Sequence, residues 1–263
     1  MVTERKKTAL ITGASSGIGV ELARIHARRG GDLVLVARRQ DRLESLKAEL
    51  ESAHGVKVHV IVQDLTRADA AAQIHRELIA RGVPIDYLIN NAGFGNGGFF
   101  HQQDWARNEA MIQVNVTALA ALTREFVPEL IARGGGRILN VASMAAFLPG
   151  PLQAIYYATK AFVVSFSEAI GNELAGTGVT VTALCPGPVK TEFIEKANLH
   201  EAKGFARTVS ARGVAKVGYN AMLKGKPLVV PGVVNKLIIH FFLRLTPRRR
   251  ATAISRAMME QKV

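Results

Sequence analysis

The chain has 263 residues, of which 48% are hydrophobic and 21% are charged, a composition typical of a globular protein and not of a disordered chain. Its single cysteine, Cys185, excludes an internal disulfide, and no uninterrupted run of about 18 apolar residues suggests a membrane span. The formal net charge of +13 suits nucleic acid, an anionic membrane surface or a phosphate-bearing cofactor as partner.

Short apolar runs alternate with helix-like segments along most of the chain. The pattern predicts strands at 8–12, 32–37, 56–62, 85–89, 137–141, 179–185 and 228–230, and helices after Gly19 and at 41–53, 68–81, 105–132 and 155–174. Strands that are apolar on both faces and alternate with helices indicate a parallel sheet covered on both sides. Because parallel connections are right-handed, we predict a single α/β domain over 1–232, a doubly wound Rossmann-type three-layer αβα sandwich.

A glycine-rich loop joins the first predicted strand to the first predicted helix. Its spacing, Thr12-Gly13-x-x-x-Gly17-x-Gly19, allows a tight turn and lets a ligand approach the backbone closely. A helix that begins there presents free amides to a pyrophosphate. The loop is therefore a candidate dinucleotide site, and a glycine-rich turn without a ligand is the alternative. The candidate contacts are Gly13, Ser15, Ser16, Gly17, Ile18 and Gly19.

Two arginines, Arg38 and Arg39, follow the second predicted strand. Dinucleotide enzymes that prefer NAD often carry an acidic residue here to hold the ribose hydroxyls. Guanidinium groups instead form charge-assisted hydrogen bonds with phosphate. We expect Arg38, assisted by Arg39, to bind the 2′-phosphate of NADP. The alternative is a pair of solvated charges at a helix start.

Tyr156 and Lys160 stand four residues apart at the start of a predicted long helix, so their side chains share one face. A phenol titrates near ~10 in water and needs a neighbouring cation to act as an acid or base at neutral pH. Ser143 follows the fifth predicted strand and can reach the same ligand. Tyr157, three residues before Lys160, is the weaker candidate, and on its own the Tyr-x-x-x-Lys spacing occurs in many helices by chance.

Taken in order, the glycine-rich loop, Asn90-Asn91-Ala92-Gly93, Ser143 and Tyr156-x-x-x-Lys160 resemble the short-chain dehydrogenase/reductase family over about residues 6 to 190. The resemblance implies a catalytic tetrad of Asn115, Ser143, Tyr156 and Lys160. In it, Tyr156 exchanges a proton with the substrate oxygen, Ser143 holds that oxygen, and Lys160 lowers the tyrosine pKa and holds the nicotinamide ribose. Asn115 organises a water beside Lys160. The resemblance also implies cofactor contacts at Asp64, Leu65, Asn91, Ala92, Gly93, Pro186, Gly187, Val189 and Thr191, besides Tyr156 and Lys160. One departure is Ser16, where many NADP-preferring members have a basic residue.

Substrate contacts are expected from the loops at 94–101, 144–152 and 192–212. The first two are apolar and aromatic, which favours a hydrophobic carbonyl or alcohol, although these side chains can equally cover a loop core or a subunit contact. The named candidates are Phe94, Phe147, Ser143 and Tyr156. The histidines show no metal-ligand clustering, so we expect no metal.

The stretch 233–263 exceeds what the sheet requires. Val234, Leu237, Ile238, Phe241 and Leu245 recur at helical spacing before Pro247 and Arg248-Arg249-Arg250. A basic amphipathic helix can lie on a membrane, and it can as easily pack on another subunit or close the substrate pocket.

These features together predict a cytoplasmic, NADP(H)-dependent oxidoreductase that interconverts a hydrophobic carbonyl compound and its alcohol, with a membrane-peripheral location as an alternative. The resemblance suggests a homodimer or homotetramer, and we expect no nucleic-acid partner, because zinc-finger, RNA-recognition and helix-turn-helix patterns are absent. An NAD-linked alcohol dehydrogenase and a non-catalytic dinucleotide-binding sensor or scaffold remain the alternatives.

Overall fold

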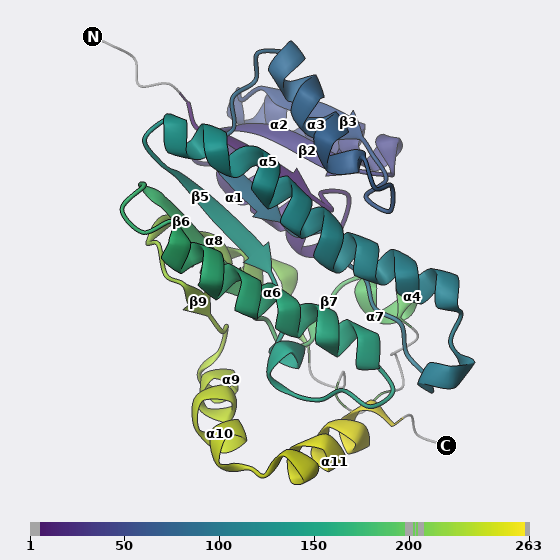
Figure 1. The fold of residues 1–263 in the computed structure, drawn as a ribbon. Helices are drawn as coiled ribbons and strands as arrows, with labels where there is room; N and C mark the ends of the chain where they lie inside the picture. The colour runs from purple at the N-terminus through teal and green to yellow at the C-terminus, as the bar shows by residue number, and fades with distance from the viewer. Residues whose placement is uncertain (1–5, 198–201, 203, 205–207, 261–263) are drawn as a thin grey trace.

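A seven-stranded parallel sheet forms the centre of the protein (Figure 1). The computed structural model describes residues 6–197, 202, 204 and 208–260. The strand order β3-β2-β1-β4-β5-β6-β9 reverses direction between β1 and β4, as the predicted doubly wound fold requires. The strands are β1 (Thr8–Thr12), β2 (Asp32–Ala37), β3 (Val58–Val62), β4 (Tyr87–Asn90), β5 (Gly136–Val141), β6 (Val179–Leu184) and β9 (Leu228–Val229). The predicted fold class is confirmed.

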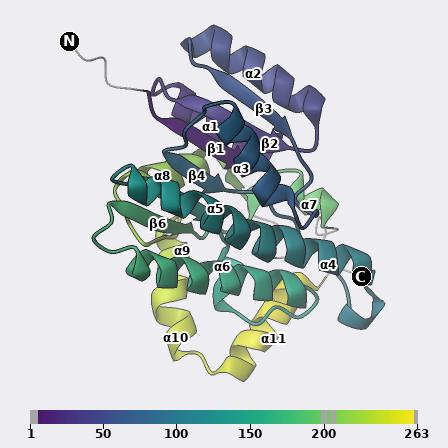
Figure 2. The same cartoon turned by 45° about the horizontal axis from the view of Figure 1, so that its top comes forward.

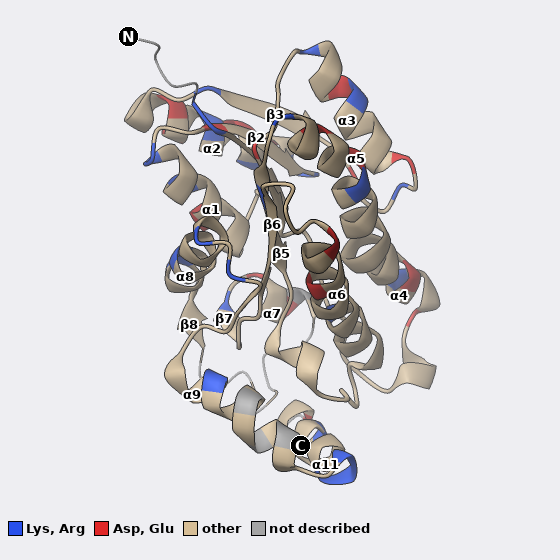
Figure 3. Cartoon of the chain, turned by 60° about the vertical axis from the view of Figure 1, so that its left-hand side comes forward, with Lys and Arg blue, Asp and Glu red and all other residues tan. Residues whose placement is uncertain are grey.

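Helices cover both faces of the sheet, which Figure 3 shows nearly edge-on. One face carries α1 (Gly17–Ala27), α2 (Gln40–His54) and α8 (Ala211–Leu223). The other carries α3 (Ala70–Ala80), α6 (Ala154–Glu173) and the continuous run of α4 (Trp105–Ile112), η2 (Gln113–Ala118) and α5 (Leu119–Ala132). The sequence of β2 is largely apolar because both faces of the strand are buried: Leu35 packs on the α1 side and Val34 on the α3 side.

Helix α8 was not predicted, and the stretch around it was interpreted as substrate loop up to residue 212. Gly213 and Gly218 weaken its helical signal, since glycine is a poor helix former. Tertiary packing overrides that weakness, because Val214, Tyr219 and Met222 are buried against the sheet. The rest of the predicted loop contains α7 (Phe193–Lys196) and β8 (Val209–Ser210), which pairs with β7 (Val189–Lys190). Residues 198–201, 203 and 205–207 of that loop lie outside the described residues.

The C-terminal extension leaves the last strand and lies below α6 at the carboxyl end of the sheet in two different views (Figures 1 and 2). Its helical pieces are α9 (Val233–Leu237), η5 (Ile238–Phe242), α10 (Leu243–Leu245) and α11 (Arg248–Met259). Ile239 is buried against Val230 and Cys185, whereas the predicted apolar face, including Leu237 and Phe241, is largely exposed. The predicted apolar periodicity is present, but most of it faces outward. Residues 261–263 lie outside the described chain.

Candidate active site

The candidate site residues gather where the parallel strands end. Ser143 follows β5, Asn91 follows β4 and the glycine-rich loop follows β1. Since the carboxyl ends of parallel strands share one edge, and the strand order reverses between β1 and β4, these loops meet at the crevice where such sheets bind ligands. The topology therefore places the two halves of the predicted site, cofactor loop and acid–base group, at one edge.

The glycine-rich loop forms a close-fitting cradle at the start of α1. Gly17 has φ +57°, and a Cβ there would lie 2.9 Å from the Thr191 Cγ2 atom. A Cβ on Gly19 would overlap the Gly13 carbonyl and lie 2.7 Å from the Asn91 amide nitrogen. The α1 N-cap, Ser16, makes no side-chain capping hydrogen bond to the helix amides. The cradle thus has the backbone shape and free amides that suit a pyrophosphate.

Asn91 and Thr12 clamp the loops after β1 and β4 together. The Asn91 side-chain amide donates to the Thr12 carbonyl at 2.9 Å and to the Gly13 carbonyl at 3.3 Å. The Thr12 hydroxyl accepts from the backbone amides of Asn91 and Ala92, both at 3.0 Å. These bonds give the Asn-Asn-Ala-Gly segment a structural task besides any ligand contact.

The two arginines after β2 differ sharply in setting. Arg39 donates to the Ser15 carbonyl at 3.1 Å and the Ser15 hydroxyl at 3.2 Å, and pairs with the Glu192 carboxylate at 3.0 Å. The Arg38 side chain is 70% exposed and lies 4.0 Å from the Asp64 carboxylate. The fixed guanidinium on the cradle is therefore that of Arg39, the residue expected only to assist.

Two of the predicted cofactor contacts, Asp64 and Leu65, follow β3. The Asp64 carboxylate accepts from the Thr66 backbone amide at 3.0 Å, which fixes a turn, and Leu65 is buried in the core beside α3. Both residues lie on the Arg38 side of the cradle, as a ligand extending from the loop toward β2 would require.

Ser143, Tyr156 and Lys160 come together beside this cradle. Tyr156 and Lys160 lie on α6 and are buried, and Ser143 precedes η3 (Met144–Phe147) in extended conformation. Tyr156 and Ser143 are joined by a side-chain hydrogen bond. The Lys160 Nζ atom lies 5.8 Å from the Tyr156 ring centroid and donates to the Val141 carbonyl at 2.8 Å. The predicted phenol, hydroxyl and ammonium thus form one cluster.

Burial controls the ionisation of this cluster. It raises the pKa of the Tyr156 phenol well above its ordinary value, and the hydrogen bond with Ser143 offsets only part of that rise. Burial also lowers the pKa of Lys160 to about 8, while the neighbouring Cys185 opposes the change. Desolvation therefore dominates the pKa of the phenol, and the lowering of that pKa by Lys160 stays a prediction. At neutral pH the phenol is protonated and Lys160 is mostly cationic.

Asn115 lies in the π-helical segment η2, where the helix widens for one turn. Its side-chain oxygen accepts from the Phe94 amide at 3.1 Å, and its amide donates to the Phe94 carbonyl at 3.0 Å and to the Thr159 hydroxyl at 3.1 Å. A Cβ on Gly93 would lie 3.0 Å from the Asn115 oxygen and 3.4 Å from the Lys160 Nζ atom. Asn115 thus holds the loop after β4 against α6, next to Lys160.

The segment after β6 closes the cradle from the other side. The Pro186 carbonyl accepts from the Met144 amide at 2.9 Å, and Val189 is buried in β7. Thr191 packs against Gly17, as described above. A Cβ on Gly187 would lie 3.2 Å from the side-chain amide of Asn235, which belongs to α9. The predicted cofactor segment therefore touches both the glycine-rich loop and the C-terminal extension.

Aromatic residues lie around Tyr156. Phe193 of α7 lies with its ring centroid 5.3 Å from that of Tyr156, and Tyr157 lies 6.2 Å away. Phe94 packs in the same cluster, whereas Phe147 packs in a separate cluster with Ile239. Of the two predicted aromatic substrate contacts, the structure brings only Phe94 next to the phenol. Phe193 was not singled out, although its place two residues after Thr191 could have suggested it.

Helix α11 covers this aromatic side. Ser255 is buried beside the Tyr157 phenol, whose pKa burial raises although Ser255 opposes the change. The Arg256 guanidinium lies 6.0 Å from the Phe99 ring centroid, over the loop after β4. Helix α11 therefore packs over the aromatic residues next to Tyr156, and which of the three roles the extension performs stays a prediction.

A buried chain of polar side chains supports the strand ends and was missed by the sequence analysis. The Asn90 amide donates to the Asn140 oxygen at 2.9 Å and to the Thr123 hydroxyl at 3.2 Å. The Asn140 amide in turn donates to the Ser167 hydroxyl at 2.9 Å. The chain ties β4 and β5 to α5 and α6, directly beneath the cluster of Ser143 and Tyr156. Polar residues within an apolar strand, such as Asn140, were the available signal.

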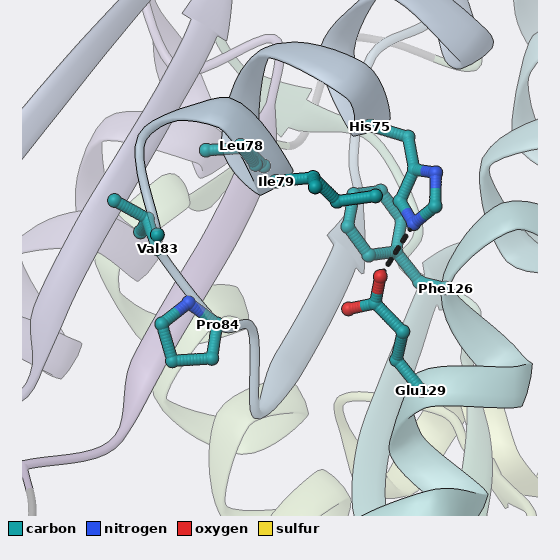
Figure 4. Close-up of a pocket in the computed structure, with 8 residues that line it drawn as sticks. His75, Leu78, Ile79, Val83, Pro84, Phe126 and Glu129 are labelled. Atoms are coloured by element: carbon teal, nitrogen blue, oxygen red, sulfur yellow. Dashed lines mark hydrogen bonds and ion pairs between the residues drawn. The ribbon is translucent and has the colours of Figure 1, made fainter.

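A surface pocket of about 280 Å³ lies elsewhere, between α3 and α5 (Figure 4). Its His75 pairs with Glu129 at 2.6 Å and with Glu125 at 3.3 Å, so its imidazole is already engaged. The pocket faces the loop that leads into β4, which is the opposite end of the sheet from Ser143. It plays no part in the candidate active site.

Comparisons with known proteins agree with this geometry. A family model described as short chain dehydrogenase matches residues 7–202. An uncharacterized oxidoreductase of Myxococcus xanthus is 36% identical over 221 residues, covering 81% of this chain and 87% of the relative. A short-chain dehydrogenase from Sphingobium yanoikuyae in complex with NADPH is 35% identical, with a TM-score of 0.81 and 90% of both chains covered. A bulky-bulky ketone specific alcohol dehydrogenase from Comamonas testosteroni is 31% identical, with a TM-score of 0.77 and 88% of both chains covered. The chain belongs to the short-chain dehydrogenase/reductase family of oxidoreductases.

Proposed function

We propose that this oxidoreductase uses NADP(H) to interconvert a hydrophobic carbonyl compound and its alcohol, with Tyr156 as the general acid and base. The observation that carries the proposal is the cluster of Ser143 with the buried Tyr156 and Lys160 at the strand ends, beside the glycine-rich cradle. A protein that only bound a dinucleotide would have no chemical need for a buried phenol paired with an ammonium.

The residues of the cradle fit a dinucleotide. The absence of side chains at Gly17 and Gly19 lets the loop pack closely against Thr191 and Asn91, and the uncapped start of α1 offers amide donors. Arg39 adds a fixed cation beside Ser15, which favours a 2′-phosphate and hence NADP. The NADPH bound by the Sphingobium relative supports this choice. Lys160 would hold the ribose, and 186–191 would face the nicotinamide amide.

The protonation states favour carbonyl reduction at neutral pH. The nicotinamide, when bound, supplies the hydride. Tyr156 holds a proton at its Oη atom because burial raises its pKa, so the phenol can donate to a carbonyl oxygen as negative charge develops there. The Ser143 hydroxyl can donate a hydrogen bond to the same oxygen. The cationic Lys160 stabilises the phenolate that remains until solvent returns a proton.

The apolar surroundings of Tyr156 favour a hydrophobic substrate. Phe94, Phe193 and Tyr157 surround the phenol, and α11 shields this side from water. A bulky ketone suits such a wall, and the ketone specificity of the Comamonas relative supports that class. The segment that carries Phe193 also carries Glu192, which is paired with Arg39.

Substitution Tyr156→Phe tests the proposal. NADPH oxidation is followed with an aryl alkyl ketone and a steroid ketone, and NADPH and NADH binding is measured by fluorescence. Tyr156→Phe is expected to retain NADPH affinity and to lose at least a thousandfold in kcat, because the proton donor is gone. Tyr87→Phe, a phenol remote from the cluster, is the matched control. Retained turnover in Tyr156→Phe would refute the assignment, and tighter binding of NADH than NADPH would move the function to an NAD-linked alcohol dehydrogenase.

We also propose that the protein is a cytoplasmic homodimer or homotetramer with peripheral membrane contact through its extension. The half-exposed Phe162 stacks on Phe166 on the outer side of α6, with ring centroids 5.4 Å apart, and offers an apolar contact to a second subunit. Sedimentation equilibrium of Phe162→Ser should show dissociation; an unchanged mass would remove α6 from the interface.

A further inference from the structure

The outward side of the C-terminal extension is rich in exposed apolar side chains. Seven of the sixteen large apolar residues that are exposed in the described part of the chain lie within 233–259. Five of them, Val233, Val234, Leu237, Phe241 and Leu245, are between 53% and 83% exposed. We call these five the apolar face. Its inward counterpart, Ile239, is buried, so the helical pieces are held on the body while the apolar face points away from it.

The same extension is strongly basic. Between Val233 and Met259 the sequence has six Lys and Arg residues and no Asp or Glu. Arg248, Arg249 and Arg250 are exposed at the start of α11, directly after the apolar face, and Lys236 is exposed within it. Figure 3 shows basic residues at both ends of this segment. Six positive charges of the net +13 are therefore concentrated in about a tenth of the chain.

This combination selects among the partners that could cover the apolar face. A second copy of the chain would bring a like cluster of positive charge against the first, and the repulsion opposes a symmetric contact. Nucleic acid would match the arginines but would leave exposed Phe241 and Leu245 without a complementary surface. An anionic bilayer matches both, since apolar side chains enter the headgroup boundary while arginines remain with the lipid phosphates.

We propose that the apolar face and Arg248–Arg250 dock the enzyme on an anionic lipid bilayer. Within the described residues no helix is long and apolar enough to cross a bilayer, so the contact is interfacial. Ser255 and Arg256 of α11 contact Tyr157 and Phe99, so the docked side is also the substrate side of the site. This placement delivers carbonyl compounds dissolved in the membrane to Tyr156, an inference that rests on the proposed function.

Co-sedimentation of the full chain with vesicles tests the docking. Vesicles of phosphatidylcholine alone are compared with vesicles that also contain phosphatidylglycerol, at low and raised salt. We expect binding to the anionic vesicles only, weakened by salt. The triple variant Arg248→Gln/Arg249→Gln/Arg250→Gln is expected to lose about a hundredfold in partitioning, and Phe241→Ser/Leu245→Ser at least tenfold. The matched control Arg42→Gln/Arg67→Gln/Arg212→Gln removes the same charge elsewhere and should lose much less.

Several outcomes would overturn the docking. Absence of wild-type binding to anionic vesicles, or an equal loss of binding in the control triple variant, would refute docking through the apolar face and Arg248–Arg250. A dimer that Phe241→Ser/Leu245→Ser converts to monomer, without vesicle binding, would make the face a subunit contact. Binding of duplex DNA that depends on the three arginines but not on the apolar pair would make it a nucleic-acid surface. NADPH binding and turnover of a water-soluble ketone, measured separately, keep failure of docking distinct from failure of the proposed enzyme function.

Discussion

Burial of the Lys160 ammonium should cost stability, and removing its charge should show how much. The side chain is only 5% exposed, and its hydrogen-bond acceptor, the Val141 carbonyl, is neutral. Lys160→Met keeps the length of the side chain and removes the charge. Because Met cannot donate to Val141, the variant also leaves one buried carbonyl unpaired, which costs about 1–3 kcal/mol at every pH.

The magnitude follows from the pKa. Burial lowers the pKa of Lys160 from 10.5 to about 8, and at ~1.4 kcal/mol per pH unit the buried cation costs about 3 kcal/mol at neutral pH. Below pH 8 the lysine is protonated in both the folded and unfolded states, so the cost is complete. Between 8 and 10.5 the unfolded chain binds more protons than the folded one, so stability rises with pH as the cost disappears. The stability of the wild type relative to Lys160→Met should therefore increase by about 2–3 kcal/mol from about pH 7 to about pH 10.

Urea unfolding of both proteins across this pH range measures that change. The difference between the two proteins cancels most of the titration of distant groups. The neighbours that face Lys160 are Tyr156 and Cys185, whose own pKa values burial raises, so Cys185→Ala is made in both backgrounds as a check. Lys216→Met, on the exposed side of α8, should show no pH-dependent difference. A flat difference between wild type and Lys160→Met would mean that the ammonium is not destabilised by burial, and the reasoning would fail.

Four further predictions concern the cradle and its support. Arg39→Ala should weaken NADPH binding at least tenfold in fluorescence titrations and NADH binding little, because a charge-assisted hydrogen bond to phosphate contributes about 1.5–3 kcal/mol; equal losses for both coenzymes would make Arg39 a support of the loop only. Arg38→Ala should lose less than Arg39→Ala, and a larger loss would give the leading role back to the exposed arginine. Glu192→Gln removes the carboxylate that pairs with Arg39 and should tighten NADPH binding several-fold; weaker binding would show that the pair positions the guanidinium for the phosphate. Asn140→Leu removes one of the two acceptors of the buried Asn90 amide and should cost about 1–3 kcal/mol in urea unfolding; a change below about 0.5 kcal/mol would contradict a supporting role.

Local patterns predicted the sheet and the grouping of Tyr156 with Lys160, because each rests on short-range rules; the catalytic role of that pair stays a prediction. Strand β2 was predicted at its observed bounds from an apolar run, and the Tyr156–Lys160 spacing needed only the helical repeat. Helix α8 was not predicted because its glycines lower the helix propensity of the segment, and its helical structure depends on packing against β5 and β6. The position of Phe147 could not be predicted for the same reason, because the neighbours of a loop side chain are distant in sequence.

The C-terminal extension shows that the periodicity of apolar residues predicts a helical face but not what that face packs against. Helical spacing of Leu237 and Phe241 indicated an apolar face but could not say whether the protein body or something else covers it. Ile239, which lies outside the predicted apolar repeat, packs on the protein body instead. The direction of the face depends on how the chain turns after β9, and that turn is fixed by the side-chain amide of Asn235, which donates to the Pro231 carbonyl at 2.8 Å.

Contacts across the cradle join cofactor and substrate sides into one structure. Thr191 packs on Gly17, the next residue, Glu192, pairs with Arg39, and Phe193 then lies on Tyr156. Three consecutive residues therefore touch the glycine-rich loop, the candidate phosphate-binding arginine and the candidate proton donor in turn. A phosphate that drew Arg39 away from Glu192 would loosen the segment that holds Phe193 over the phenol. Cofactor occupancy and substrate access are thus mechanically linked through residues 191–193, and Glu192→Gln, which breaks that link without touching the phenol, should change the KM for a bulky ketone more than that for a small one.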